Sequence, residues 1–157
     1  MKMVLYYLQT KQEPWVEEAA RQLEKKIARF IPFEVIALKS KSHSRAAAAE
    51  KKLAEEKKLL EVLNDGDFVI LFDEKGKLSK GSKEFAQQVQ KALESGKQRV
   101  VFVIGGPYGF TDAIRKKSRV MLSLSPLTMN HFVAKVASLE QLYRAFTILK
   151  NIPYHND

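Results

Sequence analysis

Short apolar runs alternate with segments of helical periodicity along nearly the whole chain, and this alternation limits the possible fold more than any other feature. The intervening segments repeat apolar residues at helical spacing, as Phe85, Val89 and Leu93 do. Strands and helices in alternation predict an α/β fold, in which helices cover both faces of a mostly parallel sheet. The expected strands are 3–8, 33–38, 68–72, 100–104 and 119–124, and the expected helices are 14–31, 44–63, 82–95, 111–118 and 131–150.

The chain of 157 residues contains no internal repeat, low-complexity linker or break in composition. We therefore expect residues 1–157 to form a single domain with its own core. No apolar run approaches the roughly 20 residues that a membrane-spanning helix needs, which argues against a membrane partner. The absence of cysteine excludes disulfides and thiolate metal sites, fits a cytoplasmic address and leads us to expect no metal.

Basic residues outnumber acidic ones, with 27 Lys and Arg against 18 Asp and Glu and a formal net charge of +9. This excess favours a polyanionic partner, and RNA, DNA or an acidic membrane would satisfy it. Residues 46–63 are nearly balanced in charge, which indicates a solvated helix face. Arg115 and Lys116 belong to a basic cluster beside a glycine turn. A solvated face commonly explains such clusters, but the position beside a candidate pocket favours phosphate contact.

The turn Gly105-Gly106-Pro107-Tyr108-Gly109 joins the end of an expected buried strand to the start of a helix. Ligands of open α/β sheets usually bind there, beyond the carboxyl ends of the strands, and glycine lets the backbone approach them. Pro107 stands where a dinucleotide-binding fingerprint has its second glycine, and no Gly-Lys-Ser/Thr closes a phosphate-binding loop. A tight turn that needs positive φ explains the glycines equally well.

The loop 123–131 also leaves the carboxyl end of a strand and enters a helix, and its hydroxyl and amide side chains suit adenosine. Taken alone, an ordinary strand-to-helix loop with Asn130 as the N-cap is the better explanation. His131 begins the next helix and could face the same pocket, although a histidine at a helix start is more often a surface or capping group.

Tyr154 and His155 stand near the C-terminus, where chain ends are usually frayed. An aromatic ring beside a titratable imidazole nevertheless suits base stacking and proton transfer. A hydrolase is disfavoured, because the sequence shows neither paired acids nor a Ser/His/Asp pattern in a recognisable context.

Three segments taken together resemble the RlmH family of the SPOUT methyltransferase superfamily: FVIGGPYGF at 102–110, LSLSPLTMNH at 122–131 and LEQLYRAFTILKNIPYH at 139–155. The similarity extends along the whole chain in length and in order of elements. It implies a SPOUT-like α/β fold with a C-terminal trefoil knot, which general topology rules would argue against. It also implies a homodimer that transfers a methyl group from S-adenosylmethionine to N3 of a pseudouridine in 23S rRNA, in the assembled ribosome.

The resemblance assigns site residues by position. The cofactor would be held by Leu71, Phe72, Gly105, Gly106, Leu124, Ser125, Pro126, Leu127, Thr128, Met129 and Asn130. The RNA would face His131, Arg144, Tyr154 and His155, and we add Arg115 and Lys116 from the basic cluster. Methyl transfer chiefly needs near-attack positioning, but the imide N–H of pseudouridine must lose its proton. We expect His155, or a water that it positions, to assist, and Tyr154 to stack on or orient the base.

The chain departs from the family at two places. Gln9-Thr10-Lys11 stand where relatives commonly have a glycine, and the tail ends in Asn156-Asp157 without the usual basic residue. Three alternatives stay open: a SPOUT methyltransferase for another RNA such as tRNA, a ribosome-binding module without catalysis, and a flavodoxin-like nucleotide-binding protein. The last is disfavoured, because no phosphate-cradling loop follows the first strand.

Overall fold

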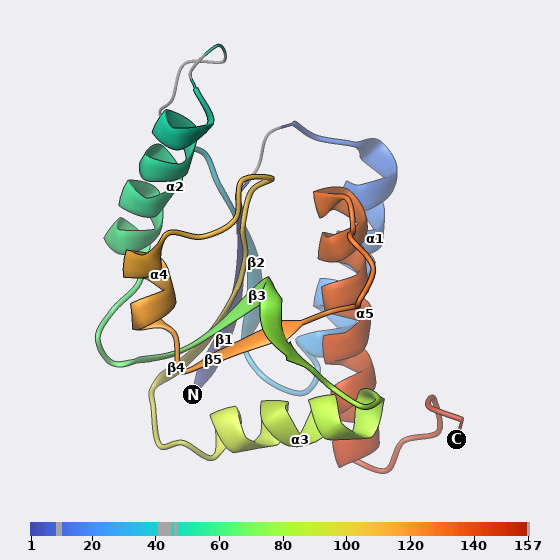
Figure 1. The fold of residues 1–157 in the computed structure, drawn as a ribbon. Helices are drawn as coiled ribbons and strands as arrows, with labels where there is room; N and C mark the ends of the chain where they lie inside the picture. Colours follow the sequence, from blue (N-terminus) through green and yellow to red (C-terminus); the bar gives the residue numbers. More distant parts are fainter. Residues whose placement is uncertain (9–10, 41–44, 46, 157) are drawn as a thin grey trace.

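The computed structural model describes residues 1–8, 11–40, 45 and 47–156, in which strands and helices alternate (Figure 1). The strands are β1 (Lys2–Leu8), β2 (Phe33–Leu38), β3 (Asp67–Leu78), β4 (Arg99–Ile104) and β5 (Val120–Ser123). The helices are α1 (Pro14–Ile27), α2 (Ala48–Val62), α3 (Ser82–Leu93), α4 (Asp112–Lys117) and α5 (His131–Leu149). The chain departs from the family at five residues in two places. Three of these residues, Gln9, Thr10 and Asp157, lie outside the described residues.

The strands form one parallel sheet in the order β2-β1-β4-β3-β5. Leu71 of β3, for example, lies opposite Val103 of β4 and Met121 of β5. This arrangement confirms the predicted α/β fold. Because parallel strands all point the same way, the glycine turn after β4 and the loop after β5 leave the sheet at the same edge.

Two apolar layers fill the two faces of the sheet, and β4 contributes to both. Phe102 packs in the layer covered by α1, α3 and α5, whereas Val101 and Val103 pack in the layer covered by α2 and α4 (Figure 1). Burial on both faces explains why residues 100–104 read as a continuous apolar run.

β3 is longer than its apolar run indicates. Phe72 and Lys77 both pair with Leu122 of β5, so residues 73–76 loop out of the ladder before β3 resumes and continues to Leu78. Gly76 lies against the backbone of β5, where an added Cβ would come within 2.6 Å of the Leu122 nitrogen. The expected strand end at 72 is therefore wrong: the polar residues mark the bulge correctly, but nothing in them marks the return to the sheet.

The start of α2 also differs from the expectation. The helix begins at Ala48, and Ala47 holds the N-cap position with an extended backbone and no capping hydrogen bond from its side chain. Within an alanine-rich segment no capping residue marks the first turn, and the expected start at 44 lies outside the described residues.

No helix in the described part of the chain is long and apolar enough to cross a membrane. The connections among β3, β4 and β5 are compatible with the trefoil knot that the resemblance implies, and the knot stays a prediction.

Candidate active site

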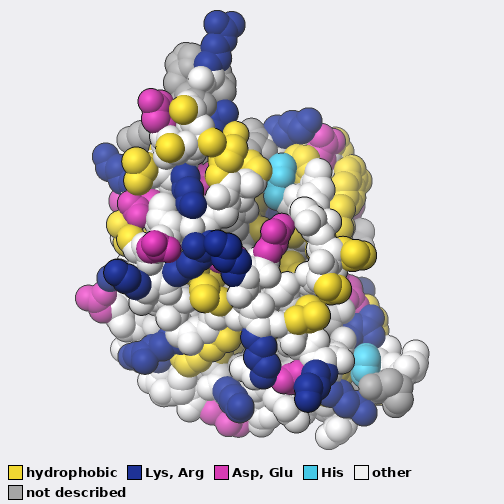
Figure 2. Space-filling view, viewed as in Figure 1, with side chains coloured by type: hydrophobic (Ala, Val, Ile, Leu, Met, Phe, Trp, Pro, Cys, Tyr) yellow, Lys and Arg dark blue, Asp and Glu magenta, His cyan; other side chains and the backbone are white. Residues whose placement is uncertain are grey.

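A cleft of about 590 Å³ opens at the carboxyl ends of β3, β4 and β5. Its walls are the bulge of β3, the glycine turn 105–109, the loop 123–130 and the start of α5. This volume lies in the range of small-molecule sites, and its place at the strand ends is where open parallel sheets usually bind ligands. The face shown in Figure 2 is hollowed between the α2 and α4 side and the α5 side, with Lys and Arg side chains around the hollow.

The glycine turn needs its glycines for two different reasons. Gly109 has φ of 78°, a conformation that favours glycine. Gly105 and Gly106 lack positive φ but are closely packed: a Cβ on Gly105 would lie 2.9 Å from the Phe110 ring, and one on Gly106 would lie 2.3 Å from Oε1 of Glu55. The turn is therefore both a backbone bend and a tightly supported wall of the cleft.

The loop after β5 is fixed by its own polar side chains. Ser123 Oγ donates to the carbonyl of Ser125 at 2.9 Å, and the Leu127 N–H donates to Ser125 Oγ at 2.9 Å. Asn130 caps α5 by accepting from the Phe132 N–H at 2.8 Å, as an N-cap does. These side chains thus shape the loop, which leaves its backbone groups and apolar side chains to meet a ligand.

A largely buried ion pair closes the cleft on the side of β3 and α4. Arg115 Nε donates to Asp73 Oδ2 at 2.9 Å, and the Asp73 side chain is only 6% exposed. Arg115 was predicted to contact RNA phosphate, but its guanidinium lines the cleft and is engaged with Asp73. Lys116 is exposed and does not line the cleft, so its contact with RNA stays a prediction.

The structure brings most of the predicted cofactor residues together. Around the cleft lie Phe72, Gly105, Gly106, Leu124, Ser125, Leu127, Thr128, Met129 and Asn130. Two predicted residues do not line it: Leu71 is fully buried in the apolar layer beneath, and Pro126 is exposed on the outer side of the loop. Leu71 can still support the site, because Phe72 follows it in the strand.

His131 lies at the same cleft, at the first position of α5. Its imidazole packs against the Phe132 ring, with ring centroids 4.2 Å apart. Burial, with a smaller effect from the positive charge of Lys11, lowers the pKa of His131 below its usual value. The ring is therefore mostly neutral at pH 7, which suits a hydrogen-bonding contact better than attraction to phosphate.

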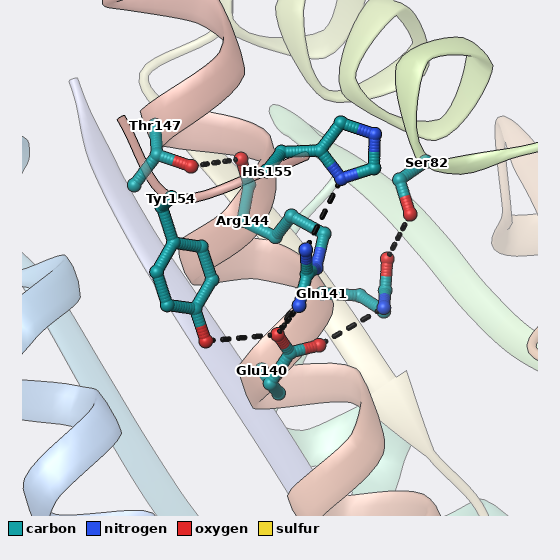
Figure 3. A network of polar contacts seen from close by, with 7 residues as sticks. All are labelled: Ser82, Glu140, Gln141, Arg144, Thr147, Tyr154 and His155. Atoms are coloured by element: carbon teal, nitrogen blue, oxygen red, sulfur yellow. Dashed lines mark hydrogen bonds and ion pairs between the residues drawn. The ribbon is translucent and has the colours of Figure 1, made fainter. Parts of the chain in front are cut away.

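The predicted residues Arg144, Tyr154 and His155 form a separate group with Glu140, which was not predicted; we call these four residues the tail cluster (Figure 3). Arg144 Nη2 lies 2.6 Å from Glu140 Oε1, and the Tyr154 hydroxyl donates to the same oxygen at 3.0 Å. Arg144 Nη1 lies 3.1 Å from His155 Nδ1. Tyr154 also packs edge-on against Tyr143, so the chain end is held against α5 and is not frayed.

The cleft and the tail cluster lie at opposite ends of α5 (Figure 1). Thirteen residues separate His131 from Arg144, which is about 20 Å along a helix that rises 1.5 Å per residue. One chain therefore does not bring Tyr154 and His155 to its own cofactor cleft.

Several cleft residues were not among those predicted. Asp73, Glu74 and Lys75 reach the cleft from the bulge of β3, a polar run that directly follows an apolar strand. Lys52 reaches it from α2, a helix whose charges indicated only a solvated face. Nothing in the pattern of charged residues on α2 indicates that one side of this helix lies against the glycine turn. No group of three His, Cys, Asp or Glu side chains that could hold a metal occurs among the described residues.

The sequence matches the family described as predicted SPOUT methyltransferase over residues 1–155. Three relatives carry the name ribosomal RNA large subunit methyltransferase H. That of Bdellovibrio bacteriovorus is 45% identical, with 99% of each chain covered. That of Cytophaga hutchinsonii is 36% identical over 99% of this chain and 100% of its own, and that of Neisseria meningitidis serogroup C is 36% identical over 100% of both.

A likeness to a solved structure agrees with the fold. A probable methylase family protein from Haemophilus influenzae Rd KW20 superposes with a TM-score of 0.53 at 16% identity, covering 99% of this chain and 70% of that one. Since the family pattern and relatives of this identity span nearly the whole sequence, the chain belongs to the SPOUT methyltransferases, in the family of ribosomal RNA large subunit methyltransferase H.

Proposed function

We propose that this protein, with residues 1–157 as one SPOUT-like domain, methylates N3 of a pseudouridine in large-subunit rRNA of the assembled ribosome, in the cytoplasm. The observation that carries the proposal is the cleft at the ends of β3, β4 and β5, whose walls include the glycine turn and the loop after β5. This cleft occurs in a chain that belongs to the SPOUT methyltransferases. The names of the relatives, which specify large-subunit ribosomal RNA, support the substrate.

The residues of the cleft fit S-adenosylmethionine. Phe72, Leu124 and Met129 offer apolar contacts to an adenine ring, and the backbone of the glycine turn and of the loop 123–130 offers hydrogen bonds to its edges and to the ribose. When bound, S-adenosylmethionine supplies an electrophilic methyl group on its sulfonium.

The chain's own task is to hold the target base in line with that methyl group. The tail cluster presents the groups for it: a phenol ring, an imidazole and a guanidinium on one helix end. Burial, followed by the hydrogen bond to Glu140, raises the pKa of the Tyr154 hydroxyl, so Tyr154 stays a neutral ring suited to stacking.

The contact between Arg144 and His155 refines the role of the imidazole. Arginine can only donate, so Nδ1 of His155 is the acceptor and the proton of the neutral ring lies on Nε2. Nε2 is buried in this arrangement, so the tail must shift before His155 can offer its N–H to a carbonyl oxygen of the base. For His155 to take up the imide proton itself, its Nδ1 must first lose the contact with Arg144. Otherwise a water that His155 positions takes the proton.

The distance of about 20 Å along α5 between His131 and Arg144 supports a homodimer, in which the tail cluster of one protomer completes the cleft of its partner. Apolar side chains available for such an interface are exposed at both ends: Trp15 and Val133 near the cleft and Ile152 in the tail. Light scattering of the purified protein tests this part, and a monomer at micromolar concentration would contradict it.

Two measurements test the proposal as a whole. Calorimetric titration with S-adenosylmethionine should show one binding site per chain, and absence of binding would leave only the non-catalytic ribosome-binding module. Mass-spectrometric mapping of 23S rRNA from a strain that lacks the protein should show the loss of one methylated pseudouridine. Intact rRNA methylation with a missing tRNA methyl group would instead assign the enzyme to tRNA.

A further inference from the structure

A carboxyl group on α2, that of Glu55, lies directly behind the glycine turn. The residue is only 7% exposed. A Cβ built on Gly106 would lie 2.3 Å from Glu55 Oε1 and 2.9 Å from Oε2, closer than real contacts allow. Gly106 therefore leaves the room that this carboxyl group occupies. On its other side Gly106 lines the cleft, so a single residue separates Glu55 from the ligand.

In its buried position, the side chain of Glu55 lowers the free energy of unfolding of the unliganded protein. Its Oε2 has no hydrogen-bond partner among the described residues, and a buried acceptor without a partner costs free energy. Burial alone raises the pKa of Glu55 from 4.5 to about 7, because desolvation disfavours the ionised form. The neighbouring Glu56, by contrast, accepts a hydrogen bond from Thr111 Oγ1 at 2.6 Å and ties α2 to α4.

The sign of this effect on stability follows from the pKa. A carboxyl group whose pKa is raised by folding adds no ionisation cost below about pH 4.5; that cost grows between pH 4.5 and about 7 and is constant above. At pH 8 the ionised form is buried without compensation. Groups that destabilise the unliganded fold concentrate at functional sites, where the bound state uses them.

We infer that Glu55 is a positioning residue for the cofactor: its carboxyl group holds the backbone of Gly106 from behind, and its unused oxygen accepts a hydrogen bond in the ligand-bound form. The inference rests on the proposed function and extends it, since it gives α2 a part in cofactor affinity. Lys52, one turn earlier on α2, lines the cleft itself, so the helix meets the site at two successive turns.

The first test compares stability with affinity at pH 8, on the full chain. Glu55→Ala should bind S-adenosylmethionine about tenfold more weakly, the size expected for one lost hydrogen bond to a charged group, and Glu55→Gln should lie between it and the parent. Both variants should melt at or above the temperature of the parent protein. The matched control is Glu61→Ala, which removes an exposed carboxylate of the same helix and should leave affinity unchanged.

The second test asks whether Glu55 and Gly106 act together. Gly106→Ala should weaken binding at least about tenfold, because its Cβ meets the carboxyl group. In the Glu55→Ala background the same substitution should cost less than about twofold, because the space is then empty.

The outcomes separate this inference from the proposed function. If the parent protein does not bind S-adenosylmethionine, the proposed function fails and the inference fails with it. If the parent binds and Glu55→Ala binds equally well, only the inference is overturned. It is also overturned if affinity falls in step with melting temperature, or if Gly106→Ala costs the same in both backgrounds, since Glu55 would then be an ordinary packing residue.

Discussion

The two ends of α5 carry two sites that are built in opposite ways. At the N-terminal end, the cleft is made of backbone turns whose polar side chains accept hydrogen bonds from backbone N–H groups, as those of Ser125 and Asn130 do. At the C-terminal end, the tail cluster is made of side chains: Glu140 holds Arg144 and Tyr154, and Arg144 holds His155 (Figure 3).

Because of this difference, we expect substitutions at the two ends of α5 to have different effects. A cleft of close-packed backbone has no room for a larger side chain, so substitutions there should act on cofactor binding. The tail cluster is partly exposed and held by charge, so substitutions there should spare the fold and act on turnover.

The largest effect is expected from Gly106→Val. Two methyl groups and a Cβ have no space beside Glu55, so the turn must move into or away from the cleft. Calorimetry should show a loss of S-adenosylmethionine affinity of at least about 100-fold, which corresponds to roughly 2.7 kcal/mol. Gly66→Val is the control, because a Cβ on Gly66 meets nothing within 4 Å. Parent-like affinity for Gly106→Val would remove the glycine turn from the cofactor site.

His155→Ala should show the reverse pattern. Turnover on intact ribosomes should fall about 100-fold, the size of a lost acid–base or hydrogen-bonding group. Affinity for S-adenosylmethionine should change by less than about twofold, because the tail lies about 20 Å along α5 from the cleft of its own chain. Asn156→Ala, the next residue and an exposed one, serves as control. Equal turnover by the His155 variant would exclude the tail from the reaction.

Glu140→Gln should have a smaller effect that isolates the support of the tail. It removes the charge that holds Arg144 and weakens the acceptor for Tyr154, so turnover should fall about tenfold, as for one charged hydrogen bond. Thermal unfolding should change by less than about 1 kcal/mol, since the ion pair is partly exposed. Glu94→Gln, which alters a surface pair with Gln90 on α3, is the matched control. Faster turnover would mean that Glu140 restrains the tail and does not position it.

Salt concentration should have the smallest effect of these changes, and it should weaken ribosome binding more than binding of S-adenosylmethionine. Raising the concentration from 50 to 200 mM should weaken ribosome binding roughly sevenfold if about two phosphates of single-stranded RNA are contacted. The affinity for S-adenosylmethionine should change by less than about twofold over this range, because the cleft is largely enclosed by protein. A flat response of ribosome binding would argue against phosphate contacts by the basic surface.

The sequence predicts the walls of the cleft better than it predicts the residues that pack behind those walls. Strand ends in a parallel sheet share one edge, so the glycine turn and the loop 123–131 could be brought together before any coordinates were known. The role of Glu55 could not be predicted in this way. It stands in a run of charges on α2, and the expectation of a solvated helix face is wrong for this residue, which is buried against Gly106.

The tail shows a second limit of sequence reasoning. Its residues were assigned only through a family resemblance. That Glu140 would hold Arg144 and Tyr154 depends on how the chain turns back after Lys150, where Asn151 adopts a φ of 55°. Asn is the non-glycine residue that most readily adopts this conformation, so the sequence can mark the end of the helix at Asn151, but it does not mark where the tail returns to α5.

The contact of Gly76 with the backbone of β5 has a consequence for how the protein is made. β5 is the last strand to be synthesised, and it must settle on an edge of β3 that offers no space for even a methyl group at position 76. Until that happens β3 presents an open edge to other chains in the cell, and two walls of the cleft are missing. The cleft is therefore incomplete until β5 has been synthesised and has paired with β3, and this one pairing both covers the open edge and adds the missing walls.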